Sequence, residues 1–335
     1  MTNHQWPNRT GLPFVGIPSF LRSRIVAPHD DFDAAIAVFG APTDEGSPFL
    51  PGSRFGPRAL REHSLRFVAA SPGYFDPNRE KVFLQREMRD GLIVDLGDAD
   101  IIATDVVSSF DNITTLTSRV LSKGAVPVVL GGDHAISYPV VRAYERDVHI
   151  VHFDAHLDYM PFVHGVSTTN AHAFRHIAHM SHVSGLLQVG IRSLRNTETM
   201  WNDTRGDGNT VVTTNRFREL GPDGVARLVP SGCDCYISLD VDVFDMSLVP
   251  GCVSAEPEGL SYAEVRDTLI ALAERTRIAG FDLVEINPML DVGTGITAYL
   301  GAHTIVEFLG HLCAPPEFAP DGAETLEPET LDAQL

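Results

Sequence analysis

Apolar runs whose residues do not alternate with polar ones recur along the chain, and most are followed by a segment with helical periodicity. Strands of this kind are covered on both faces, as in a parallel sheet between two layers of helices. The repeated alternation predicts an α/β fold, a three-layer α/β/α sandwich around a mainly parallel central sheet. The expected strands span 33–40, 91–98, 125–134, 148–156, 186–191, 235–242 and 278–286, and the expected helices 57–67, 106–121, 138–144, 172–182, 261–275 and 295–312.

Composition and charge exclude several classes of protein. The 335 residues include 25 Lys and Arg against 44 Asp and Glu, a net charge of −19 at pH 7. Such a polyanion repels nucleic acid and anionic membranes, so neither is an expected partner. No apolar run approaches the ~20 residues that span a bilayer, and the N-terminus lacks the pattern of a signal peptide. We therefore expect a cytoplasmic protein whose four cysteines are reduced thiols.

Acidic residues and histidines follow three of the apolar runs, where parallel sheets bind their ligands. Residues two apart in an extended chain share a face, so Asp154, His156 and Asp158 should point the same way. The same spacing places Asp240 beside Asp242. Carboxylates gathered in one pocket repel one another unless cations lie among them, and carboxylates with imidazoles suit divalent ions such as Mn²⁺, Zn²⁺, Ni²⁺ or Co²⁺. The candidate metal ligands are His134, Asp154, His156, Asp158, Asp240 and Asp242.

These residues lie in motifs that resemble a known family. The sequences GGDH at 131–134, DAHLD at 154–158 and SLDVDVFD at 238–245 resemble the three signatures of the ureohydrolases, the family of arginase and agmatinase. The segments PGSRFGPRALR at 51–61 and FDLVEINP at 281–288 are similar to two further family segments. The resemblance implies an arginase-like fold and hydrolysis of a guanidino group to urea and an amine, closest in character to agmatinase-like members. It also implies a homo-oligomer, a trimer or hexamer.

The resemblance implies a role for each matching residue. One Mn²⁺ would be held by His134, Asp154, Asp158 and Asp240, and a second by Asp154, His156, Asp240 and Asp242. Asp154 and Asp240 would then bridge the ions, although the same ligands accept Ni²⁺ or Co²⁺. Glu285 would bind the guanidinium through two hydrogen bonds. His172 best matches the family's proton shuttle, and His164 is the alternative.

One loop departs from the family pattern. Residues 250–259 read PGCVSAEPEG where relatives read PGTGTPEPGG, so Cys252 to Glu258 differ at five positions. Ser254 in this loop and Met160 after the DAHLD motif are candidate substrate contacts. Met160 stands where arginases carry an asparagine, and the apolar segment around it lacks donors for an α-carboxylate. We therefore expect L-arginine to be a poor substrate and agmatine to be the first candidate, with guanidine, guanidinobutyrate or a substituted guanidine or biguanide as alternatives.

Two other readings stay open. The altered loop also fits a catalytically silent subunit that supports an active paralogue in a hetero-assembly, although the intact ligand set argues against it. A one-metal zinc amidohydrolase of the deacetylase type ranks lower, because such enzymes lack the paired motifs.

We expect residues 1–30 to form an N-terminal arm, 31–313 a single catalytic domain and 314–335 an acidic tail without fixed structure.

Overall fold

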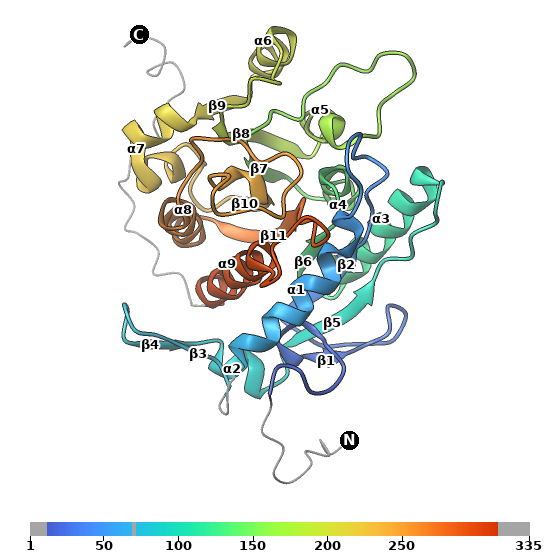
Figure 1. Cartoon of the computed structure of the whole chain (residues 1–335), viewed down its shortest axis with the longest axis vertical. Helices are drawn as coiled ribbons and strands as arrows, with labels where there is room; N and C mark the ends of the chain where they lie inside the picture. The colour runs from blue at the N-terminus through green and yellow to red at the C-terminus, as the bar shows by residue number, and fades with distance from the viewer. Residues whose placement is uncertain (1–11, 69–71, 314–335) are drawn as a thin grey trace.

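The computed structural model describes residues 12–68 and 72–313, which form a central sheet between two layers of helices (Figure 1). Its strands are β1 (Arg24–Ile25), β2 (Ile36–Ala41), β5 (Ile93–Asp98), β6 (Val126–Gly131), β7 (Val148–Phe153), β8 (Val183–Ile191), β9 (Thr210–Thr213), β10 (Asp234–Asp240) and β11 (Arg277–Val284). Within the described residues these nine strands lie in the order β1-β5-β2-β6-β11-β10-β7-β8-β9, and every neighbouring pair is parallel. The predicted parallel sheet is confirmed.

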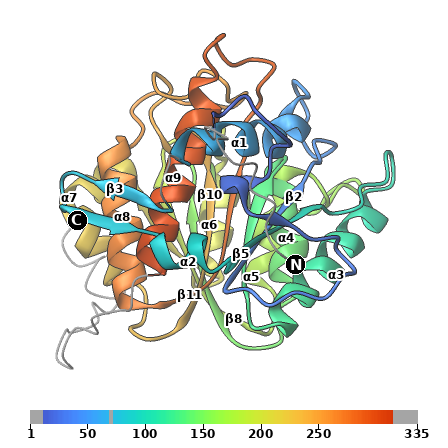
Figure 2. The same ribbon diagram turned by 90° about the horizontal axis from the view of Figure 1, so that it is seen from below.

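Helices cover both faces of the sheet. One layer contains α1 (Gly56–Ser64), α7 (Thr214–Ala226), α8 (Tyr262–Arg275) and α9 (Ile296–Leu312), and the other contains α3 (Val106–Ser122), α4 (Ser137–Val141) and α5 (Ala173–Ala178). Figure 2 shows α7, α8 and α9 on one side of the strands and α3, α4 and α5 on the other. The three-layer sandwich expected from the sequence is therefore present. Among the described residues, no helix has the length and apolar character needed to cross a bilayer.

Burial explains why the strands read as continuous apolar runs. Every residue of β2, β7 and β10 is buried, because helices pack on both faces of these central strands. Helix α8 begins as the sequence predicts: Ser261 caps it, and Glu264 completes the capping box. The helix expected at 172–182 is shorter, since α5 ends at Ala178.

Several elements were not predicted. Helix α7 is kinked at Gly221, where φ is 67°, and Pro222 follows, so its periodic pattern is interrupted. Strand β9 is short and only partly buried at the sheet edge. The other additions are β1, α2 (Gln85–Arg89), α6 (Glu198–Gly206) and the antiparallel hairpin of β3 (Tyr74–Asp76) and β4 (Lys81–Phe83).

A buried ion pair fixes α1 to the sheet. Arg61 donates from Nε to Asp95 Oδ2 at 2.8 Å and from Nη1 to Asp98 Oδ1 at 2.7 Å, both on β5. Asp95 Oδ2 also accepts from the backbone N–H of Phe20 at 2.8 Å. Part of the segment expected as an N-terminal arm therefore contacts the sheet beside its outermost strand, β1. Residues 1–11 of that arm and the tail 314–335 lie outside the described residues.

The strand order determines where the site can form. Strands β6, β11, β10 and β7 are consecutive neighbours in the middle of the sheet, although they lie far apart in the sequence. Parallel strands all point the same way, so their carboxyl ends lie along one edge of the sheet, the edge that runs across the strands. The motifs that follow these four strands are therefore brought together.

Candidate functional site

The six predicted metal-ligand residues converge at this edge of the sheet. Strand β6 ends at Gly131, and after Gly132 and Asp133 the chain enters a short 3-10 helix, η4 (His134–Ile136), which His134 opens. A Cβ on Gly132 would lie 2.1 Å from the Thr43 carbonyl oxygen, so only glycine allows this approach of the backbone. Five of the six residues are buried, and the His156 side chain is 13% exposed.

The route by which the side chains meet differs from the prediction. Strand β7 ends at Phe153, and Asp158 has a left-handed backbone with φ of 47°. Asp242 lies in another 3-10 helix, η6 (Val241–Val243), after β10. The expectation that an extended chain carries DAHLD and DVD was wrong, because the backbone turns as soon as it leaves the sheet. The turns bring the same side chains together.

His134 faces three carboxylates at once. Its Nδ1 lies 3.0 Å from Asp154 Oδ2 and 3.2 Å from both Asp158 Oδ2 and Asp240 Oδ2. Despite these distances, Nδ1 has no partner with hydrogen-bond geometry. Ligand atoms at right angles around an ion, with bonds of about 2.1 Å, are about 3.0 Å apart. The spacing and the missing hydrogen bond both fit four atoms that surround a common ion.

A second group of the same kind adjoins the first. His156 Nδ1 lies 3.1 Å from Asp154 Oδ1 and 2.9 Å from Asp242 Oδ2, and this buried Asp242 oxygen also lacks a hydrogen-bond partner. Asp154 thus presents Oδ2 to His134 and Oδ1 to His156. A carboxylate shared in this way can bridge two cations.

Groups behind the cluster fix the orientation of its imidazoles. His134 Nε2 lies 2.9 Å from Ser238 Oγ, which donates to the buried Asp282 at 2.7 Å. Nε2 is therefore the donor, which would leave Nδ1 to bind an ion among the carboxylates. The sequence analysis did not identify Ser238 or Asp282 for this role.

His152 supports Asp154 in a similar way and was also missed. It lies in β7 within the sequence HIVHFDAH, where it was counted only as a strand residue. Burial lowers the pKa of His152 to about 4, so the ring is neutral. Its Nδ1 accepts from Gln188 Nε2 at 3.1 Å, which leaves Nε2 to donate to Asp154 Oδ2 at 2.8 Å.

The electrostatics of the cluster favour bound cations. Burial, followed by repulsion from Asp154, raises the pKa of Asp158 to about 6. Burial and the neighbouring Asp242 and Asp154 raise the pKa of Asp240 well above its ordinary value. Divalent ions between these carboxylates would remove the repulsion and satisfy the unpartnered atoms. The residues present therefore fit a metal centre.

Glu285 lies beside this cluster, just after β11, with a left-handed backbone at φ of 65°. Its Oε1 accepts from the His134 backbone N–H at 2.9 Å and from Asn170 Nδ2 at 3.2 Å. Its Oε2 is buried and has no hydrogen-bond partner. Burial, followed by the charge of Asp133, raises the pKa of Glu285 to about 8. The site thus holds a buried carboxyl group with one unpartnered oxygen, and a cation placed beside it would favour the ionised form. The contribution of Asn170 was not predicted.

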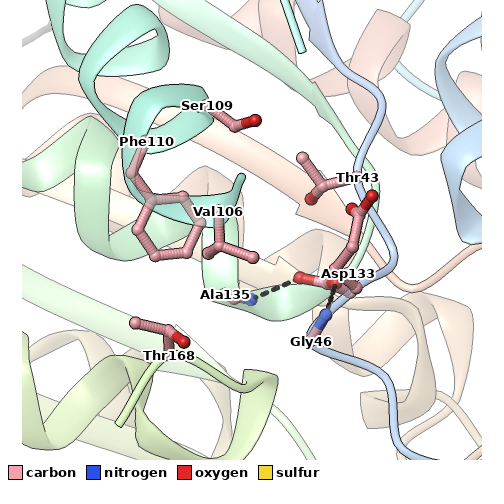
Figure 3. A pocket seen from close by; sticks show the side chains of 9 residues that line it. Thr43, Gly46, Val106, Ser109, Phe110, Asp133, Ala135 and Thr168 are labelled. Carbon is pink, nitrogen blue, oxygen red and sulfur yellow. Dashed lines mark hydrogen bonds between the residues drawn. The ribbon is translucent and has the colours of Figure 1, made fainter. Parts of the chain in front are cut away.

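A small cavity adjoins the GGDH turn (Figure 3). Its volume is about 10 Å³, which suits a single water molecule. Figure 3 shows the Asp133 carboxylate between two backbone N–H groups, those of Gly46 at 2.7 Å and Ala135 at 3.0 Å. These bonds make Asp133 a brace for the turn that carries His134.

The structure also places the other predicted residues. His172 is buried; its Nδ1 lies 2.7 Å from Thr169 Oγ1, and its ring stacks on Phe162. His164 is exposed, and the half-buried Met160 packs against the hydrophobic core. The Ser254 carbonyl accepts from Arg195 Nη2 at 3.0 Å. Arg195 in turn lies 2.7 Å from His156, so it links the altered loop to the cluster.

Comparison with known proteins decides the family. The sequence matches the arginase family model over residues 34–310. The chain belongs to the arginase family. It is a hydrolase that acts on C–N bonds, and the recognition of a ureohydrolase from its motifs is confirmed. Within this family, proclavaminate amidinohydrolase from Streptomyces clavuligerus is 31% identical over 88% of this chain and 93% of the relative.

Other arginase-family relatives are similarly distant. The mitochondrial guanidino acid hydrolase of Homo sapiens is 30% identical over 90% of this chain and 84% of the relative. Agmatinase from Bacillus anthracis is 29% identical over 78% of this chain and 87% of the relative. The solved structure of the Streptomyces clavuligerus enzyme covers 90% of this chain and 98% of its own, with a TM-score of 0.79 and 30% identity. This arginase-family chain therefore shares its fold with enzymes named for different guanidino substrates.

Proposed function

We propose that this chain hydrolyses the guanidino group of a small compound to urea and an amine, using two divalent ions. One ion would be held by His134, Asp154, Asp158 and Asp240, and the other by Asp154, His156, Asp240 and Asp242. The two-sided contact of Asp154 with His134 and His156 supports a pair of ions over a single one. We expect Mn²⁺, although Ni²⁺ and Co²⁺ suit the same donors.

The free oxygen of Glu285 is the observation that carries the proposal. When bound, the ions supply Lewis acidity and lower the pKa of water, so that an attacking hydroxide is available near neutral pH. Glu285 Oε2 is buried beside them without a partner, and a guanidinium would supply the missing donor. Because Oε1 is already held by the His134 backbone and Asn170, the carboxylate cannot swing away. Glu285 therefore fixes a planar cation against the metal cluster.

The departing amine needs a proton. We assign this transfer to His172, with His164 as the alternative. Thr169 Oγ1 contacts Nδ1 of His172 and can orient the ring. Nε2 is then the nitrogen that we expect to donate the proton to the departing amine. Burial lowers the pKa of His172, so its protonated form gives up a proton more readily than an exposed histidine does.

The side chains near the end of the substrate opposite its guanidino group guide the choice of substrate. The relatives named above act on different compounds, and a guanidinobutyrase from Pseudomonas aeruginosa is also 29% identical. Met160 packs against the hydrophobic core and offers no donor to an α-carboxylate. We therefore propose agmatine as the first candidate and L-arginine as a poor substrate. Guanidine, guanidinobutyrate and substituted guanidines or biguanides are the other members of the panel.

Urea release from this panel, measured on the purified chain after Mn²⁺ loading, tests the proposal. We expect Glu285→Gln to lose turnover and retain its metal, because the amide carries no negative charge to pair with a guanidinium and has only one acceptor oxygen. Glu274→Gln, an exposed position on α8, is the matched control.

Metal-loaded chain that releases no urea from any compound would favour the silent-subunit alternative. Light scattering on the same sample tests the proposed trimer or hexamer.

A further inference from the structure

Cys252 lies beside two of the proposed metal ligands. Its Sγ and carboxylate oxygens of Asp240 and Asp242 all lie within 4.8 Å of one another, and all three residues are buried. Among the described cysteines, this is the one that belongs to such a group. Cys233, by contrast, precedes β10, at the opposite end of the strand from Asp240.

The backbone holds Cys252 in this position from two sides. Cys252 forms an antiparallel bridge with Ile286, the residue after Glu285. Its neighbour Gly251 donates to Thr297 Oγ1 at 2.7 Å and accepts from the Asn287 backbone N–H at 2.7 Å. The thiol is therefore supported by the exit of β11 and by the start of α9.

An independent observation points to a cation at the same place. Asp242 Oδ1 accepts from the Ala155 backbone N–H at 2.9 Å, but Asp242 Oδ2 is buried without a hydrogen-bond partner. A buried carboxylate oxygen is costly to leave unsatisfied. Atoms that bind one ion with bonds of about 2.0–2.3 Å lie roughly 3.0–3.5 Å apart, so a thiol within 4.8 Å of both carboxylates lies close enough to reach the same ion after a small shift.

We propose that Cys252 Sγ is a ligand of the ion that Asp240 and Asp242 share, and that this sulfur shifts the position from Mn²⁺ toward a borderline cation such as Co²⁺ or Zn²⁺. Binding replaces the S–H bond by a sulfur–metal bond and releases the proton to solvent. Thiolate donors favour softer ions than oxygen donors do, whereas Mn²⁺ prefers oxygen. The inference deepens the proposed function, because it concerns the second ion position of that site.

Spectroscopy tests the sulfur–metal bond without reference to turnover. Metal-free full-length chain is titrated with Co²⁺, and the near-ultraviolet region is monitored for a sulfur-to-cobalt charge-transfer band. We expect the band in the unmodified chain and in Cys233→Ser, and its loss in Cys252→Thr, which installs the threonine that the family pattern carries here. Competition between Mn²⁺ and Co²⁺ should show that Cys252→Thr lowers the preference for Co²⁺ by roughly tenfold or more.

The outcomes separate this inference from the proposed function. If the chain binds two ions and releases urea but shows no sulfur band, the inference is wrong and the proposed function stands. An unchanged Co²⁺ preference in Cys252→Thr would equally overturn it. A chain that binds no divalent ion overturns both. A band that survives in Cys252→Thr would assign the sulfur contact to another thiol and contradict the role of Cys252.

Discussion

Arg195 approaches His156 on the side of the ring that faces away from the carboxylates, with Nη2 2.7 Å from Nε2. A guanidinium can only donate, so a hydrogen bond in this contact requires that Nε2 accepts and that the ring proton lies on Nδ1. An ion on Nδ1 would move that proton to Nε2, and Arg195 and His156 would then both be donors. Glu256, whose Oε1 lies 3.5 Å from Nε2, is the acceptor within reach. Binding of an ion at Nδ1 would then exchange the His156 partner from Arg195 to Glu256.

This exchange predicts opposite effects of two substitutions. Glu256→Gln weakens the acceptor for His156 Nε2–H and should lower the affinity for the second ion by roughly tenfold or more. Arg195→Met removes the competing donor and should not lower that affinity. Titration calorimetry on metal-free protein measures both. Glu258→Gln, exposed in the same loop, is the control, and equal losses in both test variants would contradict the coupling.

Loss of the shared carboxylate should empty at least one metal position. Asp154→Ala removes the oxygens that face both His134 and His156, so the protein should retain at most one ion. Metal analysis after gel filtration measures the ratio. Asp154→Asn, closer in shape, guards against simple misfolding, and Asp147→Ala at an exposed position is the control. Two ions in both Asp154 variants would disprove the bridging assignment.

The proton transfer should be separable from metal binding. His172→Ala should lower kcat by about 10²–10⁴-fold, the usual contribution of a general acid, while metal content stays near normal. His164→Ala, in the exposed part of the same loop, should leave turnover almost unchanged. The reverse pattern would transfer the role to His164.

His149 should make the fold sensitive to mild acid. Burial in β7 lowers the pKa of His149 from 6.5 to about 4. Between these values the unfolded chain takes up a proton and the folded chain does not. The free energy of unfolding therefore falls as pH drops from 6.5 toward 4, by at most about 3 kcal/mol from this group.

The measurement compares urea-denaturation midpoints at pH 7 and pH 5. His149→Gln removes the titrating ring, so its midpoint should change less between the two pH values than that of the unmodified chain. His29→Gln, at an exposed histidine, should behave like the unmodified chain. An equal pH response in all three proteins would show that His149 does not contribute.

The identities of the metal residues could be predicted from the sequence, but their geometry could not. The GGDH, DAHLD and DVD motifs follow apolar runs, and a parallel sheet brings such ends together. The prediction of an extended conformation for these motifs was wrong. Nothing local in the sequence reveals that Asp158 adopts a positive φ or that Asp242 lies in a 3-10 helix.

The supporting residues were missed for a different reason. Ser238 and His152 sit inside apolar strands, where a polar residue is easily taken for ordinary packing. Their roles depend on partners from distant segments, such as Asp282 for Ser238 and Gln188 for His152. The unpaired oxygen of Glu285 is likewise a property of the assembled fold, because it depends on which donors reach the carboxylate.

The backbone at Asp158 and Glu285, with φ of 47° and 65°, would be less strained with glycine or asparagine. Selection for stability alone would therefore tend to remove both carboxylates. At such positions, substitutions that raise thermal stability are expected to lower activity. In a library randomised at 158 and 285, the variants ranked highest by melting temperature should be poor in urea-releasing enzymes, whereas those ranked by urea release should keep the strained acids.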